Sequence, residues 1–426
     1  MDRTMDRGIG VWIGVDWSDS SHEVCVVDDQ GVRVRRFEVA NSAEGLESLV
    51  VEIRSCGTVR GVAIESTRHL VVAKLIQAGF PTYLVNPKMT KAWRDGWRVA
   101  GAKDDKFDAW VHAEGLRHHH AQLHRLGPDD EATRRLTFLV EDEMRLIDMR
   151  TALVNQLQAT LKIYYPVALE WFSDWTAPTA ADFILRFSTP EKLRSASART
   201  IYGFLKKHHI GFSMPIWQKR VENRAQKSPW PSDAATIDAK SELAISLAKM
   251  LRTLNATLNT YRTKVEPLFA NHPDAGIFSS LPGAGPKLAP RLLACFGANR
   301  DRFDSASALQ QLSGTVPVTE SSGKKRDPKV SCRWACQKRF RTTMHLYAFQ
   351  STLRCSWAAA CYEAAKSRGK DHAHALRIVA AKWLKIIFRM WQDRVPYDDA
   401  RHSAALAARY SPIPTHLATA QQAGTG

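Results

Sequence analysis

Four acidic residues stand at positions where they could act together on a phosphate. Asp16 follows an apolar run in the segment VDWS, and Glu65 ends another in the segment IEST. Asp105 and Asp108 lie in KDDKFDA, at a spacing that places both on one face of a helix. Carboxylate oxygens are the ligands that Mg²⁺ or Mn²⁺ prefers, and such ions stabilise the attacking and leaving oxygens of a phosphoryl transfer. The four residues therefore predict a divalent-metal site for phosphoryl-transfer chemistry.

Other residues near these four leave alternatives open. A single carboxylate is more often a helix cap or a solvated charge than a metal ligand, and the sequence does not exclude Asp19 or Asp104 from the set. A cluster of histidines follows the predicted site. We interpret it as a solvated helix end beside nucleic acid rather than a metal site, and it comprises His118, His119, His120 and His124.

A second candidate site lies in the segment VTESSGKKR. Ser322 precedes Gly323 and three cations that can bind phosphate, which are Lys324, Lys325 and Arg326. A serine hydroxyl is a weak nucleophile that needs a base or a metal for activation, and no Ser-His-Asp spacing surrounds it. By composition alone the segment is more typical of an ordinary loop than of a catalytic one.

The first 125 residues must supply the frame that positions the carboxylates. Apolar runs, turn residues and a capped helical segment predict the order strand, strand, strand, helix, strand, helix, strand. These elements are expected at 11–15, 23–27, 34–39, 46–53, 59–64, 70–78 and 81–85. The order is mixed α/β and is that of a ribonuclease-H-like domain.

Two long helices are predicted in the middle of the chain, at 129–165 and about 235–269. Apolar residues recur along both in alternating steps of three and four, and Pro166 ends the first helix. The pattern is typical of an antiparallel coiled-coil arm and also of a plain helical bundle within one monomer. Between them, residues 167–234 interleave aromatic and basic side chains, which either stack on nucleic acid or form the core of a small helical tip.

The last part of the chain is predicted to be mainly helical. The segment SLPGAGPK is a tight turn whose glycines free backbone N–H groups to face a phosphate, so we expect Gly283, Gly285 and Lys287 to contact nucleic acid. A later helix, at 373–391, carries four cations, which are Arg377, Lys382, Lys385 and Arg389. The expected domains are thus 1–125, then 126–270 with an insertion at 167–234, then 271–426.

The charge balance indicates a polyanionic partner. The 426 residues include 60 Lys and Arg against 43 Asp and Glu, a formal net charge of +17, and the excess is concentrated in the last quarter. No run approaches the roughly 20 apolar residues that cross a bilayer, which favours nucleic acid over a membrane. The N-terminus lacks an apolar signal-peptide core and the seven cysteines form no CxxC pair, so we expect a cytoplasmic protein with reduced thiols.

Together, these motifs resemble those of a known family. The chain is similar to insertion-sequence transposases with a DEDD N-terminal domain, relatives of the pilin-gene invertases that are also called bridge-RNA-guided recombinases. The similar segments are IGVDWS, AIEST, KDDKFDA, SLPGAGPKLAPRLLACFG, LQQLSGTVPVTESSGKK and GKDHAHALRIVAAKWLKIIFRMWQDRVPYD. They span nearly the whole chain, although residues 167–234 match no motif.

The resemblance implies a fold, a mechanism and partners. It implies a RuvC-like domain whose four acidic residues hold a divalent metal, a coiled-coil arm for assembly, and a C-terminal transposase domain with Ser322 as the catalytic serine. The implied partners are donor and target DNA and a structured guide RNA. The implied assembly is a homo-oligomer in which a dimer proceeds to a tetramer, with the site formed between protomers.

The sequence departs from the family pattern at two places. Asp104 stands where a serine or threonine commonly precedes the third carboxylate, and KKRDPKVS replaces a glycine-rich stretch after the serine. Ser321 is the neighbour that keeps the choice of Ser322 open.

Two other functions compete with a serine recombinase. A structure-specific endonuclease of the Holliday-junction-resolvase kind would use the same carboxylates with water as the nucleophile, and it would not need Ser322. A non-catalytic nucleic-acid-binding protein built on a decayed domain would bind no metal. The presence of all four carboxylates argues against that last function.

Overall fold

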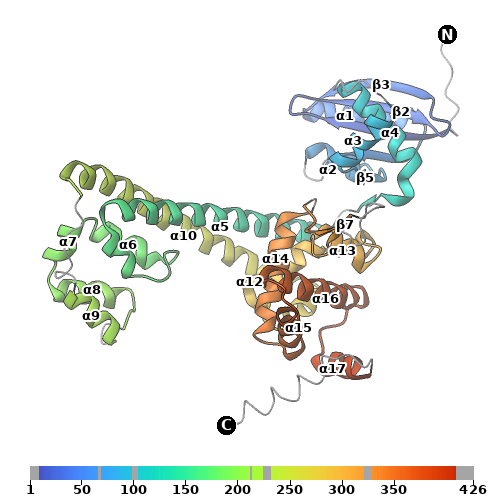
Figure 1. The fold of residues 1–426 in the computed structure, drawn as a ribbon. Coiled ribbons are helices and arrows are strands. Elements are labelled where there is room, and N and C mark those ends of the chain that lie inside the picture. The colour runs from blue at the N-terminus through green and yellow to red at the C-terminus, as the bar shows by residue number, and fades with distance from the viewer. Residues whose placement is uncertain are drawn as a thin grey trace. The chain divides into compact units, whose positions relative to one another are not determined.

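The computed structural model describes residues 9–65, 69–97, 104–123, 125–127, 129–211, 214–223, 232–320, 329–334 and 336–408 (Figure 1). The chain divides into two compact units, one of residues 1–130 with 297–426 and the other of residues 131–296. These are units of packing, and the three expected domains stay a prediction. Within the described ranges, no helix combines the length and the hydrophobicity needed to cross a bilayer.

A six-stranded mixed sheet forms the N-terminal part of the first unit, in the order β3-β2-β1-β4-β5-β6. β1, β2 and β3 are antiparallel neighbours, β1, β4 and β5 run parallel, and β6 pairs antiparallel with β5. The predicted mixed α/β sheet is confirmed, with β1 to β5 and the two helices α1 and α2 in the predicted order, and further elements follow β5. The elements are β1 Gly10–Trp17, β2 Ser21–Asp28, β3 Arg33–Ala40, α1 Ala43–Ser55, β4 Thr58–Ile64, α2 Leu70–Gln77, β5 Thr82–Leu84, α3 Pro87–Trp97, α4 Asp105–His119, η1 His120–Gln122 and β6 Arg125–Leu126.

Local signals explain where the first of these elements begin and end. The turn between β2 and β3 contains Gly31 at a φ of 81°, which glycine adopts without the strain that a side chain would add. Asp28 stabilises the turn because its Oδ1 accepts hydrogen bonds from two backbone N–H groups. Ser42 caps α1 by accepting a hydrogen bond from the backbone N–H of Gly45 at 3.1 Å.

Successive side chains of β1 alternate between the two faces of the sheet. Val11 and Val15 pack with the apolar residues of α1 and α2 in one core. Trp12 packs on the opposite face, in a second core that includes residues of α4. The same alternation places Gly14 and Asp16 on the α4 face, which decides where the acidic residues meet.

Two long antiparallel helices, α5 and α10, form the frame of the second unit (Figure 1). The antiparallel direction follows from their partners, since Glu143 contacts Arg262 while Arg150, further along α5, contacts the earlier residue Asn255. Glu143 is 5% exposed and also pairs with Arg291 of α12, which ties three helices together. The two predicted helices are confirmed, and the coiled-coil arm stays a prediction. The unit comprises α5 Glu131–Tyr164, η2 Pro166–Glu170, α6 Pro178–Arg186, α7 Pro190–Ser195, α8 Ala198–Lys207, α9 Pro215–Asn223, α10 Ala234–Ala270, α11 Ala275–Ser279 and α12 Gly285–Phe296.

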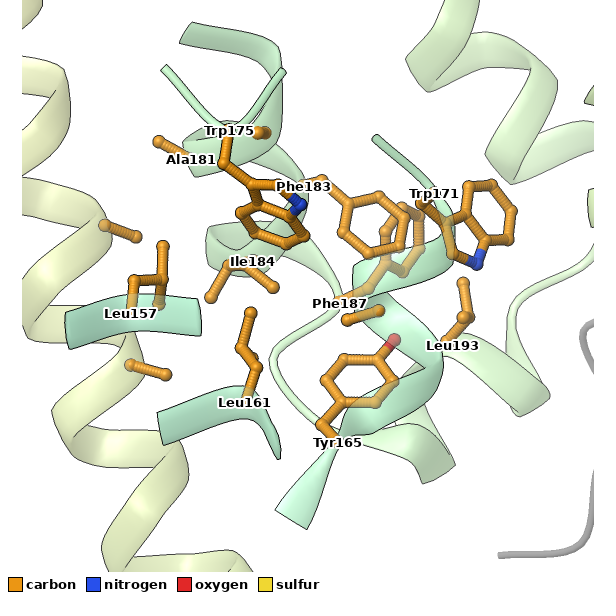
Figure 2. Packing of buried hydrophobic residues seen from close by; sticks show 14 of the residues in the cluster. Leu157, Leu161, Tyr165, Trp171, Trp175, Ala181, Phe183, Ile184, Phe187 and Leu193 are labelled. Carbon is orange, nitrogen blue, oxygen red and sulfur yellow. The ribbon is translucent and has the colours of Figure 1, made fainter. Parts of the chain in front are cut away.

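The aromatic residues between α5 and α10 form a hydrophobic core. Figure 2 shows Trp171, Phe183 and Phe187 packed with apolar side chains of α5, and each of the three is at most 3% exposed. Rings buried in this way have no free face on which a base could stack. The structure therefore decides between the two alternatives for residues 167–234 in favour of the core of a small helical tip.

The C-terminal part of the first unit is mainly helical, as predicted. α14, α15 and α16 pack around large buried side chains, among them Trp357 and Trp383, whose ring centroids lie 4.6 Å apart. The Nε1 of Trp383 donates a hydrogen bond to the hydroxyl of Ser351 at 2.8 Å, so its one polar atom is satisfied inside the core. The elements are η3 Arg300–Arg302, α13 Ala306–Leu312, β7 Val318–Glu320, β8 Lys329–Ser331, α14 Lys338–Thr352, α15 Ser356–Ser367, α16 His372–Asp393 and α17 Asp399–Ala408.

Candidate metal centre

Asp16 and Glu65 stand at equivalent positions on neighbouring parallel strands. Val15 of β1 pairs with Ile64 of β4, and each of these residues is followed directly by the acidic one. Neighbouring strands run about 4.8 Å apart. The register therefore places Asp16 and Glu65 side by side, at the C-terminal ends of β1 and β4.

Asp105 and Asp108 reach the same end of the sheet from α4. The helix lies unusually close to β1 at Gly14, where an added Cβ atom would stand 2.0 Å from the backbone oxygen of Ala109. Only glycine permits this approach. Because Asp108 is one residue before Ala109 on the helix, the close contact brings the first turn of α4 to the level of Asp16.

The structure gathers three of the four predicted acidic residues into one cluster. Carboxylate oxygens of Asp16, Asp105 and Asp108 all lie within 4.8 Å of one another. Asp16 is half-buried, Asp105 is exposed and Asp108 is 3% exposed, so the cluster opens to solvent on one side. Such a set of hard oxygen donors, with an open side for a substrate oxygen, fits a Mg²⁺-type ion.

The electrostatics of Asp16 are those of a crowded acidic site. Its pKa is raised to about 6, mainly by burial, with a contribution from the neighbouring carboxylates of Asp108, Asp105 and Glu65, while His112 acts in the opposite direction. Burial and like charges both disfavour the ionised form. A bound cation would instead favour the ionised form of Asp16. A raised pKa is therefore compatible with an acidic residue whose charge a metal would neutralise.

Glu65 lies outside this group of three and contacts a buried histidine. His112 is 1% exposed, its Nδ1 donates a hydrogen bond to the backbone oxygen of Val15 at 3.2 Å, and its Nε2 lies 3.4 Å from Oε1 of Glu65. Burial raises the pKa of Glu65, but the hydrogen bonds from His112 and Thr90 outweigh it and leave the pKa below its usual value. Glu65 is therefore held ionised, next to the cluster.

Arg94 of α3 contacts both oxygens of Asp108. Its Nη2 donates a hydrogen bond to Oδ2 at 2.7 Å, and its Nε lies 2.7 Å from Oδ1. A two-point contact of this kind is the strongest ion-pair geometry available to a carboxylate. Arg94 therefore compensates the charge of the most deeply buried member of the cluster.

The structure also shows the surroundings of the other acidic residues and histidines that the sequence did not exclude from the metal site. Asp104 is the N-cap of α4, where its Oδ1 accepts a hydrogen bond from the backbone N–H of Lys106 at 3.1 Å. Asp19 is exposed in the turn after β1. His118 contacts Glu114, and His119 stacks on an aromatic ring of α3, so both lie at the end of α4 away from its first turn. His124 lies outside the described residues.

The second predicted site is described only at its borders. β7 and β8 pair antiparallel and are joined by residues 321–328. The predicted nucleophile and its neighbours fall within that connection and lie outside the described residues, namely Ser321, Ser322, Gly323, Lys324, Lys325 and Arg326. Of the predicted phosphate-contacting turn, Gly283 and Gly285 have positive φ and Gly285 and Lys287 are exposed. Their contact with nucleic acid stays a prediction.

Sequence reasoning missed His112, Arg94 and Gly14. The first had a detectable signal, because His112 follows Asp108 by four residues and therefore lies on the same helix face. The second had none, since Arg94 lies on a different helix and only the packing of α3 against α4 brings it to Asp108.

Comparison with known proteins bears on both halves of the chain. Residues 13–166 match the model of the DEDD transposase domain of IS110 elements, and residues 275–363 match that of the IS116/IS110/IS902 transposase family. The first match contains all four acidic residues, and the second contains Ser322.

Similar proteins align along almost the whole chain. A Streptomyces coelicolor protein assigned as the mini-circle transposase of IS117 is 28% identical over 94% of this chain and 98% of its own length. The uncharacterized 42 kDa protein of insertion element IS900 from Mycobacterium paratuberculosis is 27% identical over 93% of this chain and 99% of its own. Because two parts of one kind of enzyme are matched in order along the chain, and relatives that align along almost their whole length come from insertion elements, the protein is a transposase, and it is similar to those of the IS110/IS116/IS902 family.

Proposed function

We propose that this transposase is an RNA-guided, site-specific DNA recombinase that joins metal-assisted chemistry at its acidic cluster to nucleophilic attack by Ser322. The observation that carries the proposal is the convergence of Asp16, Asp105 and Asp108 within 4.8 Å, beside Glu65, in a transposase. The strand order β3-β2-β1-β4-β5 supports a ribonuclease-H/RuvC-like classification of the sheet domain.

The four carboxylates would hold the divalent metal, Mg²⁺ or Mn²⁺. Bound there, the metal supplies positive charge beside the scissile phosphate and lowers the pKa of a coordinated hydroxyl. Asp16 is half-buried and Asp105 is exposed, whereas Asp108 contacts Arg94 and Glu65 contacts His112. A metal would therefore compete with Arg94 for the oxygens of Asp108.

Ser322 would supply the nucleophile. Its Oγ loses a proton to the surrounding solvent or a neighbouring base and attacks the scissile phosphorus, and the bond to the 3′ oxygen breaks. The products are a 5′-phosphoserine link and a free 3′-OH, which then attacks the phosphoserine of the partner strand and releases the serine. The number of phosphodiester bonds is conserved, so the exchange needs no external energy source.

The assembly that we propose rests on the family resemblance. Ser322 lies more than 200 residues after Asp108, so the site is composite, and the resemblance implies that it forms between protomers of a homo-oligomer, a dimer that proceeds to a tetramer. The three domains at 1–125, 126–270 and 271–426 would then serve metal binding, assembly through a coiled-coil arm, and strand transfer. The partners would be donor DNA, target DNA and a structured guide RNA, for which the net charge of +17 is suited.

A nicked suicide substrate tests the serine chemistry. DNA nicked near the crossover should leave protein covalently attached to a 5′ end, and the adduct should survive denaturation. Ser322→Ala should lose the adduct completely, because a displacement of about 1 Å already lowers such rates by roughly 10²-fold. Ser321→Ala, the matched control, should retain it.

The same assay identifies the competing enzyme. If Ser322→Ala cuts DNA at the parental rate and produces free 5′-phosphates, water is the nucleophile. The acidic cluster would then serve a Holliday-junction-resolvase-like endonuclease, which needs the carboxylates alone.

A further inference from the structure

A cavity of about 370 Å³ lies in the C-terminal part of the chain, between α16 and the segment that leads into β7. One wall consists of residues Gly314–Pro317, which lead into β7. Ser331 and Cys332, at the end of β8, complete this wall. The other side is a face of α16. A volume of this size is at the lower end of the range for small-molecule sites and is sufficient for one nucleotide unit.

The face of α16 that lines the cavity is strongly basic. It presents Arg377, Lys382 and Lys385, at spacings that keep them on one side of the helix, while the opposite side packs in the core through residues such as Val379 and Trp383. No described carboxylate lies within ion-pair distance of these three cations. Arg389, one turn further on, differs because it pairs with Asp393 at 2.6 Å.

The remaining lining separates apolar from polar groups. Val316, Pro317 and Ile378 give an apolar wall, whereas Thr315 and Ser331 add hydroxyl groups. Arg377 is half-buried and Lys382 and Lys385 are exposed, so the three cations together attract an anion to the opening of the cavity. The lining thus suits a ligand with an apolar body and a single anionic group, which describes a sugar and base joined to a phosphate.

We propose that this cavity binds one nucleotide unit of a single nucleic-acid strand, with its phosphodiester on Arg377, Lys382 and Lys385 and its sugar and base against Val316 and Ile378. The proposal deepens the proposed function, on which it rests, by assigning a strand-binding site to the helix beside the β7–β8 hairpin. The shared ligand chemistry is the phosphodiester, and a DNA strand and a guide RNA are its two sources.

A native thiol in the cavity provides the first test. Cys332 lines the cavity and is half-buried, so a maleimide should modify it in the full-length protein. A saturating 12-nucleotide single-stranded DNA or RNA of matched sequence should slow that modification at least about tenfold. Protection by one of the two identifies the strand, and protection by both identifies the shared phosphodiester. Buried Cys361 should stay unmodified throughout, which shows that the fold is intact.

Charge-removing variants provide the second test. The triple variant Arg377→Gln, Lys382→Gln, Lys385→Gln should bind the protecting strand about tenfold more weakly and lose the protection of Cys332. It should also show a smaller salt dependence, by about 0.7 in the logarithmic slope for each lost phosphate contact. Arg389→Gln removes a cation from the same helix outside the cavity and should change neither. Ala381→Leu, which adds bulk to the lining without changing charge, should also abolish the protection.

All measurements use the Ser322→Ala variant, so that strand binding is measured without covalent attachment. The outcome of this test is therefore independent of the outcome of the serine assay. If Cys332 reacts equally fast when both strands are bound to saturation, or if Arg389→Gln weakens binding as much as the triple variant, the cavity does not hold the strand.

Discussion

At the scale of single residues, the acidic cluster owes its geometry to the groups that hold each carboxylate. Asp108 is fixed by Arg94 and Glu65 by His112, whereas Asp105 is exposed and Asp16 is half-buried among its neighbours. Two members thus contact a partner side chain and Asp105 faces solvent, an arrangement that would let a substrate oxygen complete the coordination of an ion.

The first prediction concerns the four acidic residues, with the neighbouring Asp104 as the control. Asp16→Asn, Glu65→Gln, Asp105→Asn and Asp108→Asn should each lower strand cleavage at least about 10²-fold, because each removes negative charge that the metal requires. Binding of DNA should persist through phosphate contacts elsewhere. Asp104→Asn is the matched control, since asparagine caps a helix as well as aspartate does, and it should cleave normally. Parental activity in any of the four variants would remove that residue from the site.

The second prediction concerns the competition between Arg94 and a metal for Asp108. Arg94→Gln should bind Mn²⁺ about tenfold more tightly in a titration followed by electron paramagnetic resonance, because a positive charge next to the site is removed. Without metal, the same variant should melt at a lower temperature, since Asp108 is then buried without a counter-ion. Arg60→Gln, at an exposed ion pair in the same domain, should change neither quantity. Weaker Mn²⁺ binding by Arg94→Gln would mean that Arg94 orients Asp108 for the metal.

At the scale of secondary-structure elements, the site depends on how closely α4 approaches β1. The strand supplies Asp16, the helix supplies Asp105, Asp108 and His112, and Gly14 is the position at which the two backbones meet. The distance between the elements therefore sets the distances between the carboxylates.

Gly14→Ala is the third prediction. Its added Cβ would stand 2.0 Å from the backbone oxygen of Ala109 and would push α4 outward, at a cost of at least about 1–3 kcal/mol in the free energy of unfolding. Metal-dependent stabilisation, measured as the rise in melting temperature on adding Mn²⁺, should disappear with cleavage. Gly96→Ala in α3 has no atom within 4 Å of the added Cβ and should keep both. Retention of the Mn²⁺ effect in Gly14→Ala would separate the site from this contact.

At the scale of the whole molecule, two properties stand out, which are the positive charge and the burial of the aromatic residues. The chain carries a net charge of +17, whereas the aromatic side chains that the structure describes within residues 167–234 pack in or against a hydrophobic core. We therefore expect nucleic-acid binding by this chain to depend on phosphate contacts more than on stacking in the helical tip.

The fourth prediction is that the protein copurifies with one specific RNA. Protein expressed together with the DNA that flanks its gene should carry a defined transcript, identified by sequencing the bound RNA, and raised salt should release it. Expression from the isolated gene is the control and should yield only weakly bound RNA. Random fragments in both preparations would contradict RNA guidance without affecting the metal site.

The sequence by itself determined the first strands and helices of the sheet domain, the two long helices and the candidate acidic residues, but not α3 or β6. Period-two and period-3.6 patterns identified the strands and the two long helices, because burial of one face imposes these periods whatever the partner is. The i, i+3 spacing of Asp105 and Asp108 and the position of Asp16 and Glu65 after apolar runs identified the acidic set for the same local reason.

Only the tertiary structure decided which of the nearby groups belong together. It made Asp104 a helix cap, brought Arg94 from another helix to Asp108, and turned Trp171 and Phe183 into core residues. These outcomes depend on contacts between elements that are distant in sequence, and local periodicity carries no information about such contacts. A carboxylate or an aromatic ring has the same local pattern whether it faces solvent, a metal or another helix, and packing alone makes that choice.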